Sequence, residues 1–480
     1  MKKQFVKYLV LTLLAGIQTV VCQTLQQGTG NRPLTGAWEG RLTVPGGSLR
    51  IVFNFVSTPA GRYLATIDSP DQGANGIPGD SVFAKDSIVW VSVAAVGGVF
   101  DGRRVAGTDS MTGTWKQRGM ELPLGLRFVG EHAVAPGRPQ DPKTPYPYKE
   151  EDISYANTNA GVTLAGTLTL PQGDGPFPAA VLITGSGPQD RDETVFGHRP
   201  FLVLSDYLTR KGIAVLRSDD RGVGKSTGSF GTATTRDFAG DVESAVAYLR
   251  TRKEIRADRI GLIGHSEGAL IAPMVAAENR GIAFIVMMAG PGVTGEKLIL
   301  KQGELISRAM GAPDSTVKEQ TGLNAKMFAA VKQGVDSTTT YATLHSLLMG
   351  AIGRKDSAEG KQAKNMETAI NAQIRQVMSP WFRFFLTYDP APALSKVACP
   401  VLDINGEKDL QVPPAQNIPA VKSALRSGGN KDVTVRELPG LNHLFQHATK
   451  GTPDEYMKSE ETISPDALAL IGKWITQHCK

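Results

Sequence analysis

The apolar positions in residues 150–480 alternate between short continuous runs and longer amphipathic stretches. A continuous apolar run is typical of a strand buried on both faces, as in a parallel sheet covered by helices. The sequence predicts such strands at residues 179–184, 213–218, 259–264, 283–289, 400–405 and 433–438. It predicts helices near residues 200–211, 236–252, 266–279, 414–427 and 465–478. Strands and helices that alternate in this way indicate an α/β fold with a mostly parallel sheet.

Local features refine this region. Residues 153–171 are expected to form a β-hairpin ahead of the first apolar run. Thr234 lies three residues before Asp237, a spacing similar to that of a capping box, which marks the start of a helix. No buried strand is expected from Val293 to about Leu394. We interpret residues 293–394 as a helical cap inserted at the carboxyl edge of the sheet.

Residues 34–130 follow a different pattern, with short apolar alternations separated by turn residues about every ten positions. This pattern is typical of a small antiparallel β domain, and we assign residues 31–131 to a barrel-like domain. Trp38 and Trp115 occupy matching places in "TGAWEG" and "TGTWKQ". We interpret them as core residues rather than as part of a ligand-binding barrel.

A linker is expected at residues 132–150, because the segment 136–149 carries five prolines. Proline removes a backbone donor and biases the chain towards extended forms. The α/β region then has two parts, residues 151–292 and 395–480, on either side of the predicted cap.

The first 22 residues have the features of an export signal. A basic start precedes an apolar stretch from Tyr8 to about Val21, which is shorter than the ~20 residues of a membrane-spanning helix. Cleavage after Cys22 would give an exported chain, periplasmic or secreted, with no further segment able to span a membrane. In the alternative, Cys22 is a lipoprotein anchor, but a small residue usually precedes such a cysteine and here it is Val21.

Charge and cysteine content narrow the classes of partner. The formal net charge is +6, of which Lys2, Lys3 and Lys7 supply three, so no nucleic-acid partner is expected. Cys399 and Cys479 are too few for a disulfide framework, and we expect two buried thiols, with a single bridge as the alternative. Neither has the setting of a zinc site. The sequence carries no signal for an oligomeric state.

One motif points to catalysis. Gly264-His265-Ser266-Glu267-Gly268 has the form G-x-S-x-G and lies between a predicted strand and a predicted helix, the context in which this motif is informative. A turn this tight strains the serine backbone and lifts the hydroxyl clear of the sheet edge. The catalytic interpretation of Ser266 is therefore favoured over a simple packing turn.

A serine hydroxyl needs a histidine to take its proton. Of the seven histidines, His443 follows the last predicted strand, where a loop at the carboxyl edge would reach the serine. His198 and His447 are placed less well, and the side chain of His265 is expected to point away from Ser266. We therefore choose His443 as the base.

A carboxylate must orient that histidine. Asp409 lies four residues beyond the predicted strand at 400–405, with Glu407 as the nearest competitor and helix capping as the structural alternative. Asp409 gives the chain order serine, aspartate, histidine that is typical of the strand-turn-helix hydrolases.

An oxyanion hole requires backbone donors near the serine. The Gly185-Ser186-Gly187 segment follows the first apolar run and can supply an amide from Ser186 or Gly187. The amide of Glu267, at a helix N-terminus, would be the second donor.

Together, the elbow, the Gly-Ser-Gly loop, "NGEKDLQVP" and "PGLNHLF" resemble the α/β-hydrolase superfamily. With the N-terminal β domain and "GSGPQDRD", the chain is similar to secreted bacterial carboxylesterases of the dienelactone-hydrolase-like branch. The resemblance implies hydrolysis of a small-molecule ester through an acyl-enzyme, with Ser266 as nucleophile, His443 as base and Asp409 as orienter. It implies no metal and no cofactor. Dienelactone hydrolases proper use a cysteine nucleophile, so their substrate is not implied.

The sequence departs from the family pattern at one place in the oxyanion loop. Thr184-Gly185 stands where many esterases carry His-Gly. The segment "DDRGVGKSTG" at 219–228 lacks the first glycine of a phosphate loop. We expect an ion pair there between Asp220 and Arg221, with Glu267 as a further partner of Arg221. The aromatic segment 379–390 is expected to pack in the core, with an acyl pocket lined by some of Trp381, Phe382 and Phe385 as the alternative.

Other functions remain open at this stage. An acyl-thioesterase would have the same layout. A serine peptidase of the prolyl-oligopeptidase type shares the order of the three residues but usually carries a large propeller, which roughly 100 residues of β structure do not supply. A non-catalytic binding protein of the same fold would normally have lost one of the three residues.

Overall fold

The computed structural model describes residues 33–44, 47–58, 61–69, 74–93, 96–117, 120–130, 138–334, 336–352, 361–456 and 458–479. These residues form two compact units, which are described separately. Unit 1 takes the described parts of Met1–Gly137, Ala312–Met378 and Pro453–Lys458, and unit 2 takes those of Arg138–Gly311, Ser379–Thr452 and Ser459–Lys480. The export signal predicted at residues 1–22, including Cys22, lies outside the described residues.

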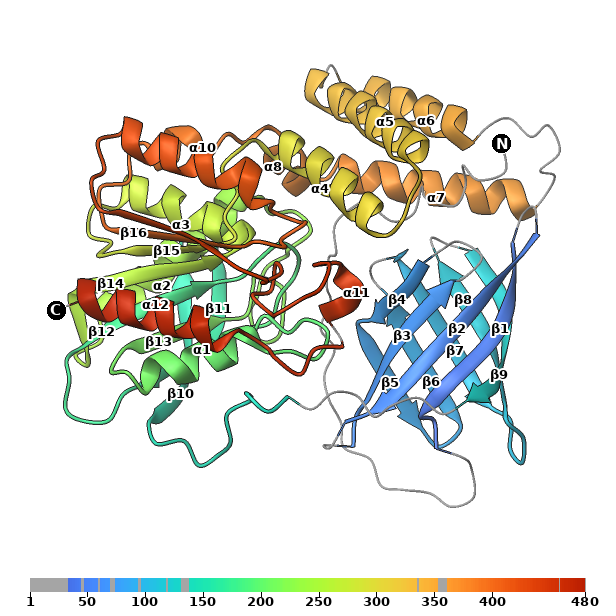
Figure 1. The fold of residues 1–480 in the computed structure, drawn as a ribbon, viewed down its shortest axis with the longest axis horizontal. Coiled ribbons are helices and arrows are strands. Elements are labelled where there is room, and N and C mark those ends of the chain that lie inside the picture. The colour runs from blue at the N-terminus through green and yellow to red at the C-terminus, as the bar shows by residue number, and fades with distance from the viewer. Residues whose placement is uncertain are drawn as a thin grey trace. The chain divides into compact units, whose positions relative to one another are not determined.

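A mixed eight-stranded sheet forms the centre of unit 2 (Figure 1). Its strands are β10 (Lys149–Asn157), β11 (Val162–Leu170), β12 (Phe177–Ile183), β13 (Ala214–Ser218), β14 (Ile255–His265), β15 (Ile285–Met288), β16 (Val401–Gly406) and β17 (Val433–Leu438). The order across the sheet is β10-β11-β13-β12-β14-β15-β16-β17. The hairpin β10–β11 is antiparallel and joins β13 antiparallel, and from β13 to β17 all neighbours are parallel. The mostly parallel sheet and the hairpin predicted from the sequence are thus confirmed.

Helices cover both faces of this sheet. They include α1 (Pro200–Thr209), α2 (Thr235–Arg250), α3 (Glu267–Glu278), α9 (Ala391–Leu394), α10 (Pro414–Ser427) and α12 (Pro465–His478). On one face, α1 contacts α12, and on the other α2 contacts α3 while α9 lies against α3 and α10 (Figure 1). Because both faces are covered, every residue of β15 and β16 is buried, which explains their continuous apolar sequence.

Helix α2 starts with the capping box that the spacing of Thr234 and Asp237 predicts. The Thr234 side chain accepts a hydrogen bond from the Asp237 backbone N–H, and the Asp237 carboxylate accepts one from the Thr234 N–H at 2.8 Å. This reciprocal capping box satisfies donors that a helix start would otherwise leave unpaired.

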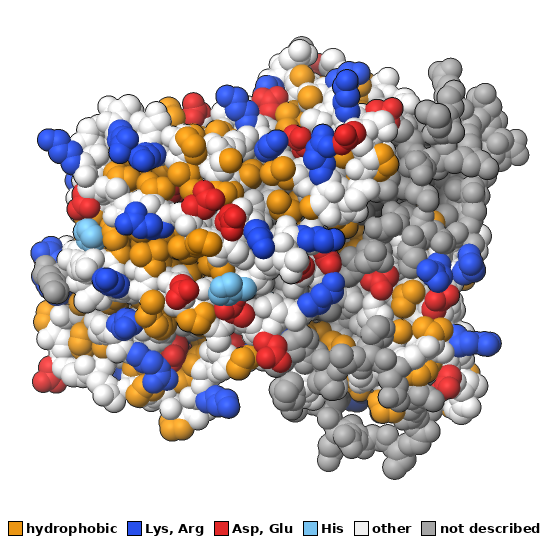
Figure 2. All heavy atoms as spheres, viewed as in Figure 1, with side chains coloured by type: hydrophobic (Ala, Val, Ile, Leu, Met, Phe, Trp, Pro, Cys, Tyr) orange, Lys and Arg blue, Asp and Glu red, His pale blue; other side chains and the backbone are white. Residues whose placement is uncertain are grey.

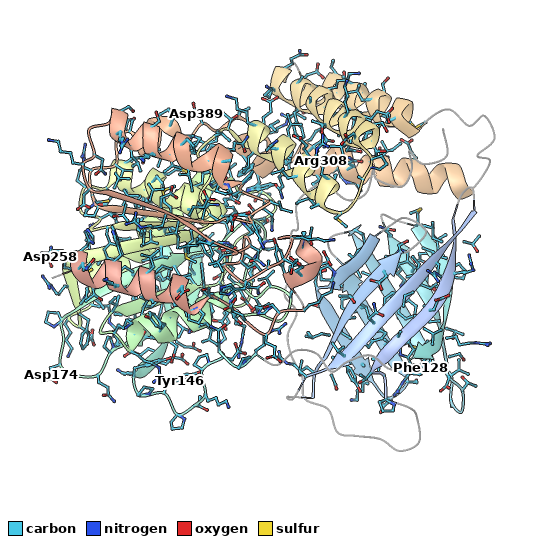
Figure 3. All side chains as sticks on the ribbon, viewed as in Figure 1. Phe128, Tyr146, Asp174, Asp258, Arg308 and Asp389 are labelled. Carbon is cyan, nitrogen blue, oxygen red and sulfur yellow. The ribbon has the colours of Figure 1, made fainter. Side chains whose placement is uncertain are left out.

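The parallel strands bring distant segments to one edge of the sheet. β14 begins at Ile255, passes the exposed Asp258 (Figure 3) and ends at the buried His265. The register pairs His265 with Met288, and it pairs Gly406 with Leu438 two strands further along. The loops that follow β12, β14, β16 and β17 therefore begin at the same edge.

Unit 1 contains a nine-stranded antiparallel sheet. Its strands are β1 (Gly36–Val44), β2 (Gly47–Ser57), β3 (Tyr63–Ser69), β4 (Ala74–Gly79), β5 (Ser81–Lys85), β6 (Ile88–Val93), β7 (Gly98–Arg104), β8 (Ser110–Gln117) and β9 (Met120–Gly130). The order is β4-β3-β2-β1-β9-β8-β7-β6-β5, and β3 also contacts β5, so the two ends of the sheet approach each other. This curl is that of the small β domain expected from the sequence.

Aromatic side chains fill the inside of this curled sheet. Trp38 and Trp115 are both buried in one apolar core, as their matching sequence positions predict. The Phe53 ring lies between those of Phe100 and Trp115, at centroid distances of 5.1 and 6.1 Å. Such edge-on and tilted contacts are favourable aromatic arrangements.

The interval predicted as a helical cap is helical throughout its described residues. It contains α4 (Gly295–Ala309), α5 (Asp314–Gln333), α6 (Ser337–Ile352), α7 (Lys361–Val377), α8 (Pro380–Thr387) and α9. The structure divides this interval, because α4, α8 and α9 belong to unit 2 whereas α5, α6 and α7 belong to unit 1. The role of these helices as one cap stays a prediction.

Positive and negative side chains share the surface. On the face of the molecule drawn in Figure 2, Lys and Arg side chains are interspersed with Asp and Glu. Among the described helices, none is both long and apolar enough to cross a bilayer.

One buried carboxyl group in the sheet lacks a hydrogen-bond partner among the described residues. Asp403 in β16 is fully buried, and neither of its carboxylate oxygens has a hydrogen-bond partner among the described residues. Burial raises the pKa of Asp403 to about 7. The folded protein therefore keeps this proton at pH values where the unfolded chain releases it.

We predict that this group makes the protein less stable as the pH rises. Below about pH 4 both states hold the proton and there is no penalty, and between about pH 4 and pH 7 only the unfolded state ionises. Asp403→Asn removes the ionisation, so it should stabilise the protein at pH 8 by about 2–4 kcal/mol more than at pH 4.5. Thermal melts of the two proteins at both pH values would measure this difference, with the exposed Asp258→Asn as the control. An equal shift of Tm at the two pH values would contradict it.

Candidate active site

A strained turn connects β14 to α3. Ser266 has φ 54° and ψ −115°, a left-handed conformation that costs free energy for any residue with a Cβ. Its backbone N–H donates to the Met288 carbonyl oxygen at 2.9 Å, which ties the turn to the end of the neighbouring strand. The turn is the one predicted for a G-x-S-x-G motif between a strand and a helix.

The two glycines of the motif are required by close backbone approaches. A Cβ on Gly264 would collide with the Gly268 carbonyl group, in the first turn of α3. A Cβ on Gly268 would collide with the Ile183 carbonyl oxygen, at the end of β12. The glycines thus let α3 begin directly against two strands, and this holds Ser266 at the edge of the sheet.

The loops after β16 and β17 bring Asp409 and His443 together. The His443 Nδ1 lies 2.8 Å from Asp409 Oδ2, and both side chains are almost fully buried. The second oxygen, Asp409 Oδ1, accepts hydrogen bonds from the backbone N–H groups of Gln411 and Val412, both at 2.8 Å. These amides hold the carboxylate in place and stabilise its charge.

The histidine loop is anchored to the end of β16. A Cβ on Gly406 would collide with the Leu441 carbonyl, and the Lys408 N–H donates to that same oxygen at 2.9 Å. The Asn442 side chain accepts hydrogen bonds from the N–H groups of Leu444 and Gln446. These contacts give His443 a fixed position in a loop without regular secondary structure.

The competing residues lie elsewhere. His447 is exposed and pairs with Glu461, and Glu407 is exposed and accepts a hydrogen bond from the Gly440 N–H. His198 is buried, with its Nδ1 3.0 Å from the Thr462 hydroxyl. The structure therefore favours the pair Asp409 and His443 over every alternative weighed from the sequence.

The residue before Ser266, His265, contacts His443 of this pair. The ring of His265 lies 4.8 Å from the ring of His443, and its Nε2 is 3.0 Å from the His443 carbonyl oxygen. Within the described residues, no hydrogen bond joins the Ser266 hydroxyl to His443. Such contacts are often long before substrate binds, so the serine–histidine contact belongs to the proposal below.

The Gly-Ser-Gly loop lies against the serine. A Cβ on Gly185 would be 3.3 Å from the Cβ of Ser266. The Gly185 N–H donates to Glu193 Oε1 at 2.7 Å, and the Ser186 side chain hydrogen-bonds Glu267. Gly187 has φ 100°, which favours glycine.

The charged part of "GSGPQDRD" clamps this loop to β13, a function that the sequence pattern did not reveal. Arg191 makes two side-chain hydrogen bonds to Asp219, at 3.0 and 2.7 Å. Asp192 pairs with Arg217, which is almost fully buried. The loop is thus held by two ion pairs at the end of a central strand.

Two expected ion pairs are wrong. Arg221 binds the Asp241 carboxylate on α2 through two hydrogen bonds, at 2.7 and 2.8 Å, and not Asp220. Asp220 instead accepts hydrogen bonds from the Thr184 hydroxyl and the Gln189 N–H. Planar guanidinium groups favour such two-point contacts with one carboxylate, and the helix α2 offers one within reach.

Glu267 also has partners other than Arg221. Its carboxylate accepts hydrogen bonds from the Thr235 hydroxyl at 2.7 Å and from Trp381 Nε1 at 2.8 Å. Burial raises the pKa of Glu267, and the hydrogen bonds from Thr235, Trp381 and Ser186 oppose that shift. The residue after the serine therefore ties α2 and α8 to the turn.

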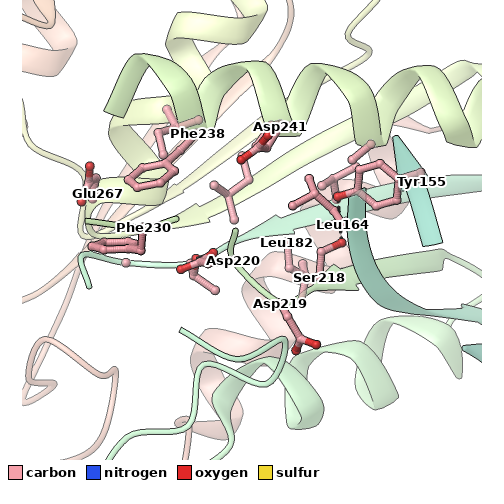
Figure 4. A pocket seen from close by; sticks show the side chains of 17 residues that line it. Tyr155, Leu164, Leu182, Ser218, Asp219, Asp220, Phe230, Phe238, Asp241 and Glu267 are labelled. Atoms are coloured by element: carbon pink, nitrogen blue, oxygen red, sulfur yellow. Dashed lines mark hydrogen bonds between the residues drawn. The ribbon is translucent and has the colours of Figure 1, made fainter. Parts of the chain in front are cut away.

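A small pocket lies beside the turn (Figure 4). Its lining combines apolar strand residues with the carboxylates of Asp219, Asp220, Asp241 and Glu267. Burial raises the pKa of Asp220 well above its usual range, and its hydrogen bonds from Gln189 and Thr184 oppose that shift. Acidic groups line this pocket, but within the described residues no three His, Cys, Asp or Glu side chains form a group able to hold a metal.

The aromatic segment at 379–390 forms α8 and its flanks. Phe382 and Phe385 are buried, in agreement with core packing, and the Trp381 ring stacks on Phe385 at 5.3 Å. Trp381 is partly exposed and its Nε1 reaches Glu267 beside the turn. The acyl-pocket alternative for Trp381 thus stays a prediction.

Cys399 and Cys479 are both free thiols, as the sequence analysis favoured, but only Cys479 is buried as expected and Cys399 is partly exposed. Burial raises the pKa of Cys399 to about 12, so it stays protonated and unreactive at neutral pH.

The close approach at Gly264 gives a direct test of the turn. Gly264→Ala should lower Tm sharply or leave the protein insoluble, because the added methyl group meets backbone atoms that cannot move aside. Gly322→Ala in α5 is the matched control, since a Cβ there meets nothing within 4 Å, and it should change stability by no more than about 1 kcal/mol. Equal melting temperatures of the two variants would contradict the role of Gly264.

The chain is similar to several known proteins. A family model described as "Serine aminopeptidase, S33" matches residues 200–346. Esterase EstD of Thermotoga maritima is 27% identical over 334 residues, which cover 69% of each chain. An uncharacterized 31.7 kDa protein of Escherichia coli is 25% identical over 272 residues, 55% of this chain and 84% of that protein. The Pyrococcus furiosus esterase Pf2001 matches in structure with a TM-score of 0.40 at 16% identity, over 69% of this chain and 93% of that one.

The mostly parallel sheet carries a strained serine turn at its carboxyl edge, and the chain is similar in sequence to Esterase EstD. The matches to this esterase and to the serine aminopeptidase family model indicate a hydrolytic enzyme.

Proposed function

We propose that this protein is a serine carboxylic ester hydrolase that acts through an acyl-enzyme. Ser266 is the nucleophile, His443 the general base and then the general acid, and Asp409 the residue that orients His443. The observation that carries the proposal is the 2.8 Å contact between His443 Nδ1 and Asp409 Oδ2 in the loops that start beside Ser266.

The hydrogen bonds of Asp409 support a defined tautomer for His443. A carboxylate only accepts, so Nδ1 carries the proton of that contact. The other ring nitrogen, Nε2, is then the one with a lone pair for the serine proton. Two backbone N–H groups and His443 donate hydrogen bonds to Asp409 and hold its carboxylate in place.

The chemistry follows from these roles. The Ser266 oxygen attacks the carbonyl carbon of the ester while His443 takes its proton, and a tetrahedral intermediate with a negative oxygen forms. His443 returns the proton to the alcohol as the C–O bond breaks, which leaves the acyl group on Ser266. Water, activated by the same histidine, then releases the acid.

The oxyanion donors are the Glu267 N–H and an amide from Ser186 or Gly187. The Gly185 N–H is already bound to Glu193, so it is not the donor from this loop. The N–H of Glu267 lies at the start of α3, where donors lack partners within the helix. Losing one donor of this kind typically costs ~3–4 kcal/mol of transition-state stabilisation.

Two neighbouring activities have their own support. The matching family is described as a serine aminopeptidase, which favours peptide amides as a second candidate class. An acyl-thioesterase needs the same nucleophile and base. The relative named Esterase EstD covers more of the chain than the family match does, and for this reason the ester is our first choice. A panel of esters, thioesters and peptide amides would rank the three.

We also propose that the protein is exported and that its signal ends at Cys22, as its first 22 residues indicate. A membership of the dienelactone-hydrolase-like branch, with a serine nucleophile, belongs to the same proposal.

Ser266→Ala should abolish ester cleavage and leave the fold intact. Removal of the nucleophile leaves no covalent route, and we expect kcat for short p-nitrophenyl esters to fall by about 10⁴-fold or more. Thermal melting would report the fold, and mass spectrometry would locate a fluorophosphonate label on Ser266 of the wild type. Unchanged turnover in the variant would refute the assignment.

Asp409→Asn should slow ester cleavage by about 10⁴-fold, because an amide no longer holds the required tautomer of His443. Glu407→Gln, at the exposed competitor, is the matched control and should retain nearly full activity. A mild effect at Asp409 together with a large one at Glu407 would reverse the two roles.

A further inference from the structure

We propose that Glu193 and His265 form a buried ion pair that positions the base His443. This inference rests on the proposed function, in which His443 is the base. Neither Glu193 nor His265 is one of the three proposed catalytic residues.

The pair joins three parts of the site. Glu193 Oε1 accepts a hydrogen bond from the Gly185 N–H at 2.7 Å and lies 2.9 Å from His265 Nδ1. His265 Nε2 lies 3.0 Å from the His443 carbonyl oxygen. One continuous chain of contacts therefore runs from the Gly-Ser-Gly loop, through the residue before Ser266, to the backbone of the base.

The hydrogen bonds dictate the protonation state. A carbonyl oxygen only accepts, so His265 Nε2 must carry a proton to contact His443. A second proton must lie between His265 Nδ1 and Glu193 Oε1, since two lone pairs at 2.9 Å would repel. The Gly185 N–H donates to the same Oε1 and stabilises the charged carboxylate, so the second proton resides on the histidine. His265 is thus an imidazolium and Glu193 its counter-ion.

The surroundings of His265 agree with this state. Burial alone would lower the pKa of His265, but the charge and hydrogen bond of Glu193, the His443 carbonyl and the charge of Asp409 outweigh it and raise the pKa. Glu193 and His265 are 4% and 6% exposed. Removing one partner of such a buried pair strongly destabilises the folded protein, because the other charge then stays buried without a counter-ion.

Strain in the Glu193 backbone indicates that its position is imposed by the fold. Glu193 has φ 52°, in the left-handed region, and its N–H donates to the Asp190 carbonyl at 2.9 Å. The clamp formed by Arg191 with Asp219 and by Asp192 with Arg217 fixes the segment just before it. The loop therefore presents the carboxylate to His265 at the cost of backbone strain.

Glu193→Gln tests this positioning. The amide keeps an acceptor oxygen but removes the negative charge, so His265 loses its counter-ion and the support of His443 weakens. We expect kcat for a p-nitrophenyl ester to fall by roughly 10- to 100-fold with KM changed by less than about threefold. The exposed Glu278→Gln on α3 is the matched control and should match the wild type.

If the pair had only a structural role, Glu193→Gln would lower Tm but leave kcat and KM of the folded protein unchanged, and that result would overturn the proposal. If Glu193→Gln does not fold, the wild type provides the test. Nitrogen-15 spectra of the histidine rings, with His265 assigned through His265→Gln, should show His265 with both nitrogens protonated at about pH 7, where an ordinary imidazole is mostly neutral. A neutral His265 at that pH would refute the ion pair.

Ser266→Ala separates this inference from the proposed function. If Ser266→Ala retains ester cleavage, the proposed function fails whatever Glu193 does. If Ser266→Ala is inactive and Glu193→Gln keeps the wild-type kcat and KM, only the present inference fails.

Discussion

The close backbone approach around Ser266 is the constraint on which the site depends. Gly264 and Gly268 allow β14, α3 and β12 to meet without a side chain between them, and the backbone of Ser266 is forced to positive φ. The strain is tolerated because packing on three sides leaves the turn no alternative. Since the position of the hydroxyl is set by the backbone, the other groups of the site must be brought to it by their own loops.

Those loops are held by buried charges whose partners are all within hydrogen-bonding distance. Asp409 is bound by two amides and by His443, and Glu193 by Gly185 and His265. Charges in a medium of low dielectric interact strongly, so each pair fixes its loop more firmly than an exposed pair would. Asp403 is the exception among the described residues of the sheet, and its unpaired carboxylate favours the neutral form.

Side-chain pairing is where prediction from the sequence was weakest. The expected partner of Arg221 was its neighbour Asp220, whereas the observed partner is Asp241 on the next helix. Glu267 was expected near Arg221 and instead binds Trp381, 114 positions away. His265 was expected merely to point away from the serine, yet it contacts Glu193 and His443. Spacing along the chain carries no information about such contacts, because they depend on which loops meet at the sheet edge.

The sequence by itself determined the strands, most helix boundaries and the turn that carries Ser266, because local hydrophobic periodicity, capping residues and glycines specify these elements directly. It also singled out Asp409 and His443, because both follow predicted strands whose carboxyl ends share one edge in a parallel sheet. Only the tertiary structure decided that these two side chains touch, that the interval 293–394 divides between two units, and that a second histidine–carboxylate pair lies behind the first. The reason is physical: the side-chain contacts arise when loops distant in the chain are packed together, and the free energy that selects them exists only in the folded protein.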